Sequence, residues 1–454
     1  MEISTKKQRS SFSGKLGFIL AAAGSAVGLG NIWRFPYLAA KYGGGIFLLT
    51  YIILSVTFGF ALMVAEIAIG RKTGLSAVGA FEKLNKKFSF IGYLGALVPI
   101  IILPYYSVIG GWVAKYLFAF STGDASKAAN STYFTDFIGN ASEPLLWFAI
   151  FLGITAIVVL LGVEKGIEKV SKIMMPVLIV LSIGIAVYVM FIPGAIDGVA
   201  YYITPDFSKF SIMTVVAAMG QLFYSMSLAM GIMITYGSYM KKDVNIESST
   251  HQIEFFDTGI AFLAGLMIIP AVFVFSPDKL GTEAGPGLMF QTLPSIFKNM
   301  QGGAIFGTVF FLLVLFAALT SSISLMETVV SIFQDKFKWS RKFSCFIVLG
   351  ICIVLGLPSS LGNGPLASIT IIGMSFLDFF DFISNSVLMP IVALLTCIFV
   401  GYFLKTKTIE DEVELSGKFR LKALFKIMIK YIAPIFLLLV LISSILNAFG
   451  VISI

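Results

Sequence analysis

The chain is dominated by long apolar runs that are separated by short polar connections. A helix needs about 20 consecutive apolar residues to cross the hydrocarbon core of a bilayer. Eleven runs approach this length and predict eleven transmembrane helices, so we expect an all-α polytopic membrane protein. The runs centre near Ala26, Thr57, Tyr106, Gly153, Leu181, Ser225, Gly265, Phe316, Gly350, Met389 and Leu439.

Two of the runs are interrupted by residues that weaken a helix. Residues 24–36 read Gly-Ser-Ala-Val-Gly-Leu-Gly-Asn-Ile-Trp-Arg-Phe-Pro, and residues 225–231 read Ser-Met-Ser-Leu-Ala-Met-Gly. An unpaired backbone group in hydrocarbon costs several kcal/mol, so such a break is tolerated only inside protein or beside a water-filled cavity. Paired breaks in corresponding helices indicate a transporter site at the bilayer midplane.

The breaks fall in the first and sixth runs, five runs apart, which predicts two inverted five-helix repeats. We expect one transmembrane domain over residues 1–454, with a cytoplasmic segment at 1–14. The first repeat covers 15–192, the second covers 211–404, and an eleventh helix covers 427–450. A packing motif of small residues is the alternative for Gly24 and Gly28, but it does not account for Asn31 or for the second break.

The eighth run carries a polar stripe, because Ala317, Thr320, Ser321 and Ser324 follow helical i, i+3, i+4, i+7 spacing. A hydroxyl in a spanning helix often donates only to the carbonyl four residues earlier. Opposite a broken helix that offers free carbonyls, the same hydroxyls would supply oxygen ligands for a small cation such as sodium.

Composition and charge support a membrane protein. Hydrophobic residues make up 58% of the chain and charged residues 12%, whereas a soluble domain carries about 25% charge. Most of the 32 lysines and arginines fall in alternate connections, which the positive-inside rule places in the cytoplasm. We therefore expect a multi-pass protein of the inner (plasma) membrane with a cytoplasmic amino terminus and an extracytoplasmic carboxyl terminus. The net charge of +8 then requires no nucleic-acid partner.

Other readings of the chain are less favourable. The start resembles a signal peptide, but cleavage there would remove half of an interrupted helix. No nucleophile–base pair, metal-ligand spacing or nucleotide loop is evident, so we do not expect an enzyme. The single histidine, His251, lies in a predicted polar connection, and the acidic stretch at 410–414 is expected to be solvated.

Ionisable residues within the predicted helices are functional candidates. Glu66 ends the second run and Asp257 begins the seventh. Arg34 shares the predicted outer side with Asp378 and Asp381, which makes a gate-like ion pair with one of them plausible. Arg9 and Asp335 could form the counterpart at the cytoplasmic side.

Three ordered motifs resemble those of the neurotransmitter:sodium symporters. They are the residue 24–36 motif, Gly-Gln-x-x-Tyr-Ser-x-Ser-Leu at 220–228, and Ala-x-Leu-Thr-Ser-Ser at 317–322. The resemblance covers nearly the whole chain, and eleven helices are typical of the bacterial branch. It implies sodium-coupled symport of an amino acid by alternating access, with two sodium ions as coupling ions.

The resemblance implies two sodium sites. The first would use Ala26, Asn31, Ser225 and Asp257. The second would use oxygens of Gly24, Val27, Ala317, Thr320 and Ser321.

The resemblance also implies a substrate site between the broken helices. Tyr106 and the amides around Leu29 and Gly30 would hold the carboxylate, and the carbonyls of the sixth helix would accept from the amino group. The implied substrate-binding set is Ser25, Ala26, Leu29, Gly30, Ile102, Tyr106, Tyr224, Ser225, Ser227, Met230, Ser321, Ser324 and Leu325.

Gates would close each side of this site. Tyr224 would cover the pocket beneath an outer pair, Arg34–Asp381. An inner pair, Arg9–Asp335, would close the cytoplasmic path with the help of Phe12 and Tyr239.

Two residues refine the expected transport. Asp257 would supply the negative charge that chloride supplies in animal members, so we expect chloride-independent transport. Met230 replaces a bulky aromatic residue of some relatives, and its flexible thioether packs well on rings, which favours large hydrophobic or aromatic amino acids. A proton-coupled carrier, and a channel or sensor of the same fold, remain alternatives. The protein could be a monomer or a homodimer.

Overall fold

The fold is a bundle of helices wrapped around two broken ones. The computed structural model describes residues 11–448 and 451. Within these residues it contains no β-strand, only isolated bridges between Gly44 and Pro205 and between Ile371 and Met374. The all-α expectation is therefore confirmed.

Nine helices in the described part of the chain are long and apolar enough to cross a membrane, and a bent pair of helices makes a tenth candidate. The helices that form the nine are α3 (Gly45–Leu54) with α4 (Phe60–Thr73), α6 (Ser89–Ser121), α9 (Glu143–Leu160), α10 (Lys169–Met190), α14 (Ile246–Phe275), α17 (Gly303–Phe337), α18 (Arg341–Leu361), α19 (Phe376–Asp381) with α20 (Met389–Ile398), and α22 (Lys422–Ile427) with α23 (Ala433–Ala448). Short π-helical segments join or extend several of them, at Ser55–Gly59, Val163–Glu168, Phe382–Leu388, Phe399–Phe403 and Met428–Ile432.

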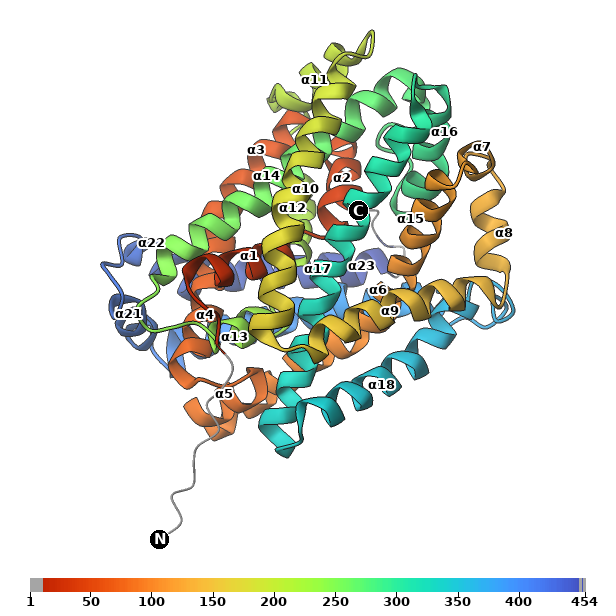
Figure 1. Cartoon of the computed structure of the whole chain (residues 1–454). Helices are drawn as coiled ribbons and strands as arrows, with labels where there is room; N and C mark the ends of the chain where they lie inside the picture. The colour runs from red at the N-terminus through yellow and green to blue at the C-terminus, as the bar shows by residue number, and fades with distance from the viewer. Residues whose placement is uncertain (1–10, 449–450, 452–454) are drawn as a thin grey trace.

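Shorter helices form the connections at the two ends of the bundle. They are α5 (Ala77–Leu84), α7 (Ala125–Ala128), α8 (Tyr133–Gly139), α11 (Ala195–Ile203), α15 (Gly285–Gly287), α16 (Leu293–Asn299) and α21 (Thr406–Glu414). A π-helical turn at Leu288–Thr292 and 3₁₀ turns at Lys86–Phe88, Phe207–Lys209 and Pro277–Lys279 complete them. Figure 1 shows α11 and α16 at one end of the molecule and α5 at the opposite end.

Both predicted breaks are present. The first helix ends at Ala26 (α1, Lys15–Ala26) and resumes as a π-helical turn at Gly30–Arg34 and as α2 (Phe35–Lys41), bent by 51° from α1. The sixth predicted run gives α12 (Ile212–Ser225) and α13 (Ile232–Gly237). All eleven predicted centres lie in helices, but α12 alone is too short to span a bilayer, so the eleven-span count stays a prediction.

The backbone of the second break is unusual. Ser227, Ala229 and Gly231 adopt φ angles of +53°, +60° and +73°. Only glycine enters this left-handed region without steric cost, so Ser227 and Ala229 must be held there by their surroundings.

Burial separates an inner group of helices from an outer one. In the most apolar windows of α3–α4 and α17, 78% of the residues are buried, but only 22% are buried in the window of α22–α23. The helices α1, α6 and α17 lie at the centre of the bundle, where α17 contacts both of the others. The two breaks lie beside this centre, which is why they can hold non-helical backbone.

Two sequence expectations are wrong. His251 is not in a polar connection but within α14, where its ring stacks on Phe60 with the ring centroids 4.7 Å apart. The acidic stretch at 410–414 is not uniformly solvated, because Glu410 and Glu412 are buried. In both cases a polar residue packs against a distant segment, which local sequence does not reveal.

Close packing of α13 on α4 depends on glycine, which leads to a test of stability. A Cβ atom at Gly70 would overlap the Ile234 carbonyl, and its surroundings there are backbone that cannot move aside. We expect Gly70→Ala to destabilise the protein by about 1–3 kcal/mol, the usual cost of overpacking. Thermal unfolding in detergent measures the effect as a lower Tm.

Gly153→Ala is the matched control, because Gly153 lies inside α9 and its Cβ would meet nothing within 4 Å. Alanine favours a helix over glycine, so this variant should keep or raise the Tm. Equal Tm values for the two variants would contradict the packing argument.

Candidate functional site

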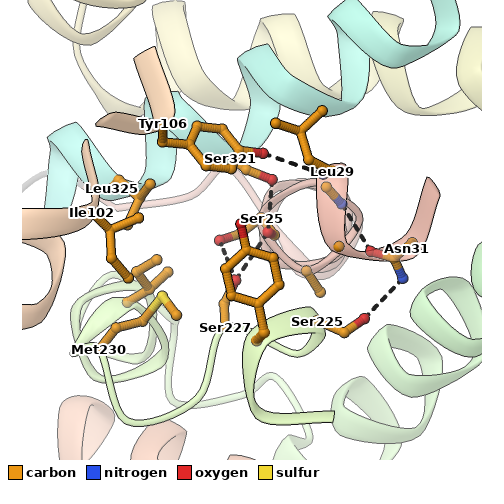
Figure 2. Close-up of a pocket in the computed structure, with 15 residues that line it drawn as sticks. Ser25, Leu29, Asn31, Ile102, Tyr106, Ser225, Ser227, Met230, Ser321 and Leu325 are labelled. Carbon is orange, nitrogen blue, oxygen red and sulfur yellow. Dashed lines mark hydrogen bonds between the residues drawn. The ribbon is translucent and has the colours of Figure 1, made fainter. Parts of the chain in front are cut away.

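A small cavity lies between the two breaks. Figure 2 shows the side chains of both breaks pointing toward it, together with side chains of α6 and α17. It is lined by Ser25, Ala26, Gly28, Leu29, Gly30, Asn31, Ile102, Tyr106, Tyr224, Ser225, Ser227, Met230, Ile232, Ser321 and Leu325. The lining is apolar on the side of Ile102, Met230 and Leu325 and polar where the breaks meet.

The lining contains twelve of the thirteen residues expected to bind substrate. The exception is Ser324, whose hydroxyl accepts from Tyr236 (2.7 Å) and donates to the Thr320 carbonyl (3.0 Å). Sequence reasoning missed Gly28 and Ile232 as lining residues. Gly28 belongs to the motif at residues 24–36, so its place in the cavity lining could have been predicted from that motif. Ile232 cannot be distinguished from the other apolar residues of its run.

Side chains satisfy the backbone groups that the first break exposes. The Gly28 amide donates to Asn31 Oδ1 (3.0 Å), and the Leu29 amide donates to the Tyr106 hydroxyl (3.3 Å). Gln221 Nε2 donates to the Gly30 carbonyl (2.9 Å). A buried backbone group without a partner is costly, so these contacts stabilise the break.

The second break is tied to the first and to α4. The Ser227 hydroxyl donates to the Ser25 carbonyl (2.9 Å) and lies 3.1 Å from the Ser25 hydroxyl. The Ala229 amide donates to Glu66 Oε1 (2.7 Å). Glu66 is buried in α4, so its carboxylate fixes the strained residue at the centre of the break.

The residues of the first expected sodium site come together. Asn31 Nδ2 donates to Ser225 Oγ (2.9 Å) and to Asp257 Oδ1 (2.8 Å), and Ser225 donates to the same Oδ1 (2.6 Å). The Tyr51 hydroxyl donates to Asp257 Oδ2 (3.0 Å). All four side chains are buried. Sequence reasoning did not find Tyr51, because nothing distinguishes it within its apolar run.

The residues of the second expected sodium site also converge. Ser321 Oγ donates to the carbonyls of Ser25 (3.0 Å) and Val27 (3.2 Å). Thr320 donates back to carbonyls of its own helix, those of Phe316 (3.0 Å) and Ala317 (3.1 Å). A Cβ at Gly24 would lie 3.3 Å from the Thr320 Cβ, so α1 and α17 are in close contact here. The cluster consists of uncharged hydroxyl and carbonyl oxygens.

Tyr224 lies between the cavity and a vestibule on the predicted outer side, and it lines both. The vestibule has a volume of about 780 Å³ and is also lined by Arg34 and Asp381. The Arg34 guanidinium carbon lies 5.8 Å from the centre of the Tyr224 ring, close enough for a cation–π attraction.

The expected Arg34–Asp381 ion pair is not formed between these described residues, although both line the vestibule. The Asp381 carboxylate instead accepts from Tyr105 (3.1 Å) and from Asn385 (2.6 Å), one turn further along its own helix. One partner from α6 and one from its own helix thus hold the acid, and Tyr224 lies between the vestibule and the cavity.

The predicted cytoplasmic side is closed by aromatic packing. Phe12 is buried among the rings of Phe18, Tyr236 and Tyr239, all arranged edge to face at centroid distances of 5.6–6.1 Å. The Phe12 amide donates to the Tyr239 carbonyl (3.2 Å). Phe12 and Tyr239 therefore meet as expected.

Of the expected inner ion pair, the structure describes only Asp335, because Arg9 lies outside the described residues. Asp335 accepts from the Ser76 amide (2.7 Å) and hydroxyl (2.6 Å). Sequence reasoning missed Glu327, which accepts from the Tyr239 hydroxyl (2.7 Å) and forms an ion pair with Arg341. An acid in the middle of an apolar run is itself a signal that would have identified Glu327.

Comparisons with known proteins agree with this geometry. The model of the sodium:neurotransmitter symporter family matches residues 9–142 and 133–451. Among similar proteins, an uncharacterized sodium-dependent transporter of Haemophilus influenzae is 33% identical over 96% of this chain and 98% of its own. A second uncharacterized sodium-dependent transporter, from Bacillus subtilis, is 34% identical over 97% of this chain and 98% of its own.

A solved structure extends the likeness to the fold. The crystal structure of MhsT in complex with L-phenylalanine superposes with a TM-score of 0.87 at 41% sequence identity, covering 96% of this chain and 100% of that chain. Together with the match of nearly the whole sequence to the family model, this shows that the chain belongs to the sodium:neurotransmitter symporter family.

Proposed function

We propose that this protein imports a hydrophobic or aromatic amino acid by symport with two sodium ions. The observation that carries the proposal is the convergence of both breaks and of Ser321 from α17 on one cavity, whose lining residue Asn31 is hydrogen-bonded to Asp257. The relative crystallised with L-phenylalanine supports an amino acid as the substrate. The fold would be the eleven-helix arrangement of two inverted repeats in the inner membrane, with the amino terminus in the cytoplasm.

Each ion would have its own set of oxygens. The first would be bound by Ala26, Asn31, Ser225 and Asp257, next to the substrate carboxylate. Asn31 presents its amide nitrogen to Asp257 in this structure, so it would turn its side-chain oxygen toward a cation. The second ion would be bound by Gly24, Val27, Ala317, Thr320 and Ser321, and Thr320 would give up its bonds to its own helix.

The substrate would lie across the cavity. The Tyr106 hydroxyl and the Gly30 amide would hold its carboxylate, and carbonyls of the second break would accept from its amino group. Its side chain would face Ile102, Met230 and Leu325, which are buried and apolar. Tyr224 would cover the site, and opening would alternate between the Tyr224 side and the Phe12 side.

Coupling to two ions is energetically sufficient for accumulation. Each charge that crosses a potential of about 100 mV contributes about 2.3 kcal/mol. Two charges would support an amino acid gradient on the order of a thousandfold, at about 1.4 kcal/mol per decade. Proton coupling is the second candidate, since Asp257 is a buried carboxylate at the break.

The first test is uptake of labelled tryptophan, tyrosine and leucine into proteoliposomes under an inward sodium gradient. We expect accumulation with sodium and none with potassium or a pH gradient alone. Thr320→Ala should abolish accumulation, because it removes the hydroxyl oxygen that the second ion would need. Thr155→Ala is a control, since this buried hydroxyl bonds to Ser322 (3.1 Å), away from the cavity. Uptake driven by pH alone would contradict sodium coupling.

The second test concerns chloride. Because Asp257 already supplies a negative charge beside the first ion site, uptake should be equal when gluconate replaces chloride. Asp257→Asn should reduce uptake at least about tenfold, since an uncompensated charge in a buried site costs well over 1 kcal/mol. If chloride stimulates uptake by the parent protein, Asp257 does not replace chloride.

The third test concerns substrate size. Met230 lines the apolar side of the cavity, and S–aromatic contacts are worth about 0.3–1.5 kcal/mol. Met230→Val should therefore raise the KM for tryptophan severalfold and change the KM for leucine less. A larger rise in the KM for leucine than in the KM for tryptophan, measured in the same vesicles, would contradict a preference for aromatic substrates.

A further inference from the structure

The acidic stretch on α21 forms a buried ionic contact that the transport site does not use. Glu412 Oε1 lies 2.9 Å from Arg71 Nε at the end of α4, and 2.6 Å from Lys242 Nζ in the loop between α13 and α14. The Arg71 side chain is fully buried, and the Glu412 side chain is only 3% exposed. The helix α21 packs directly against α4, and both lie at the same end of the bundle in Figure 1.

The Arg71 guanidinium donates four hydrogen bonds to partners from two other segments. Its Nη1 donates to the Val244 carbonyl (2.7 Å) and to Ser416 Oγ (3.1 Å), and its Nη2 donates to the Glu412 carbonyl. Lys242 Nζ in turn donates to the Arg71 carbonyl (3.0 Å). The guanidinium thus joins the end of α4, the loop at 238–245 and the α21 segment.

The α21 segment is itself anchored at its far end. The Glu247 carboxylate at the start of α14 accepts from the backbone amides of Arg420 and Leu421, both at 2.9 Å. Asn245 Nδ2 donates to the Ser416 carbonyl (3.1 Å). The segment is therefore attached to α4 and to the start of α14 at several points between Glu412 and Leu421, and it can act as a support for them.

The loop at residues 238–245, which contacts the α21 segment, also contributes to the aromatic packing at the predicted cytoplasmic side. Tyr239 lies three residues before Lys242 and packs on Phe12. Gly70 and Gly237 bring α4 and α13 into backbone contact just before this loop. The position of Tyr239 against Phe12 thus depends on a loop whose far end is held by Arg71 and Glu412.

We propose that Glu412 is a positioning residue that stabilises the state closed to the cytoplasm, by fastening the 238–245 loop to α4 through Arg71 and Lys242. Glu412 is not among the residues that line the cavity, so its removal changes which side of the protein is open and leaves the binding cavity intact. This inference rests on the proposed function in one respect, that the Phe12 side opens during transport.

The test measures how accessible α13, which packs on Phe12 through Tyr236, becomes to a reagent. Thr235 on α13 is buried, and a Thr235→Cys reporter is placed in a background whose three native cysteines, all buried, are replaced by serine. The rate of labelling by a small thiol reagent in detergent is compared with and without Glu412→Gln. We expect Glu412→Gln to raise the rate at least about fivefold, the change in population that about 1 kcal/mol produces.

Glu414→Gln is the matched control. Glu414 lies two residues further on the same helix, is 39% exposed, and pairs with Lys422 at the surface. It should leave the labelling rate unchanged, because an exposed pair contributes little. Equal rates for the parent and Glu412→Gln, or equal increases for Glu412→Gln and Glu414→Gln, would overturn the proposal.

Two further measurements separate the possible failures. Sodium-dependent binding of labelled substrate shows whether Glu412→Gln is folded. If Glu412→Gln does not fold, Lys242→Met replaces it, because this variant keeps the buried Arg71–Glu412 contact. We expect faster labelling of Lys242→Met as well. Sodium should slow labelling of the parent. If sodium does not change the labelling rate of the parent protein, the proposed function is contradicted. If Glu412→Gln and Lys242→Met both label at the rate of the parent, the role of Glu412 is contradicted.

Discussion

The structure depends on one constraint: backbone groups that leave a helix within an apolar interior must find new partners. At the first break Asn31, Tyr106 and Gln221 bond to backbone amides and carbonyls. At the second break Glu66 binds the Ala229 amide, and Ser227 bonds to the first break. These side chains replace the hydrogen bonds that the helix ladder no longer makes. The backbone around the cavity is therefore held in a non-helical form by partners from other segments.

The two sides of the cavity are closed in different ways. On the Phe12 side, several aromatic rings pack edge to face over a network that includes Glu327 and Arg341. On the other side one ring, Tyr224, separates the cavity from a vestibule that Arg34 and Asp381 line without forming an ion pair. More aromatic contacts therefore close the Phe12 side than the Tyr224 side.

Buried charges occur where segments far apart in sequence must stay together. Asp257 joins α14 to both breaks and to Tyr51, and Glu412 joins α21 to α4 and to the loop after α13. A buried carboxylate is costly unless hydrogen bonds or an opposite charge compensate it. Asp257 and Glu412 therefore each hold together segments that are distant in the sequence.

Periodicity, composition and motif resemblance were sufficient to predict the helical class, the positions of both breaks and most of the cavity lining. The class and the breaks follow from local rules: apolar runs must be helical in a bilayer, and glycine, asparagine and serine within such a run mark a break. The motif at 24–36 and the α17 stripe thus point to Asn31, Thr320 and Ser321 as candidate ligands from the sequence alone. What the sequence could not decide was pairing across the fold. Tyr51 reaches Asp257, Asp381 bonds to Tyr105 rather than to Arg34, and Glu412 is buried against Arg71. In each case the partner is distant in the chain, and whether a charge is solvated or paired depends on which helix packs beside it.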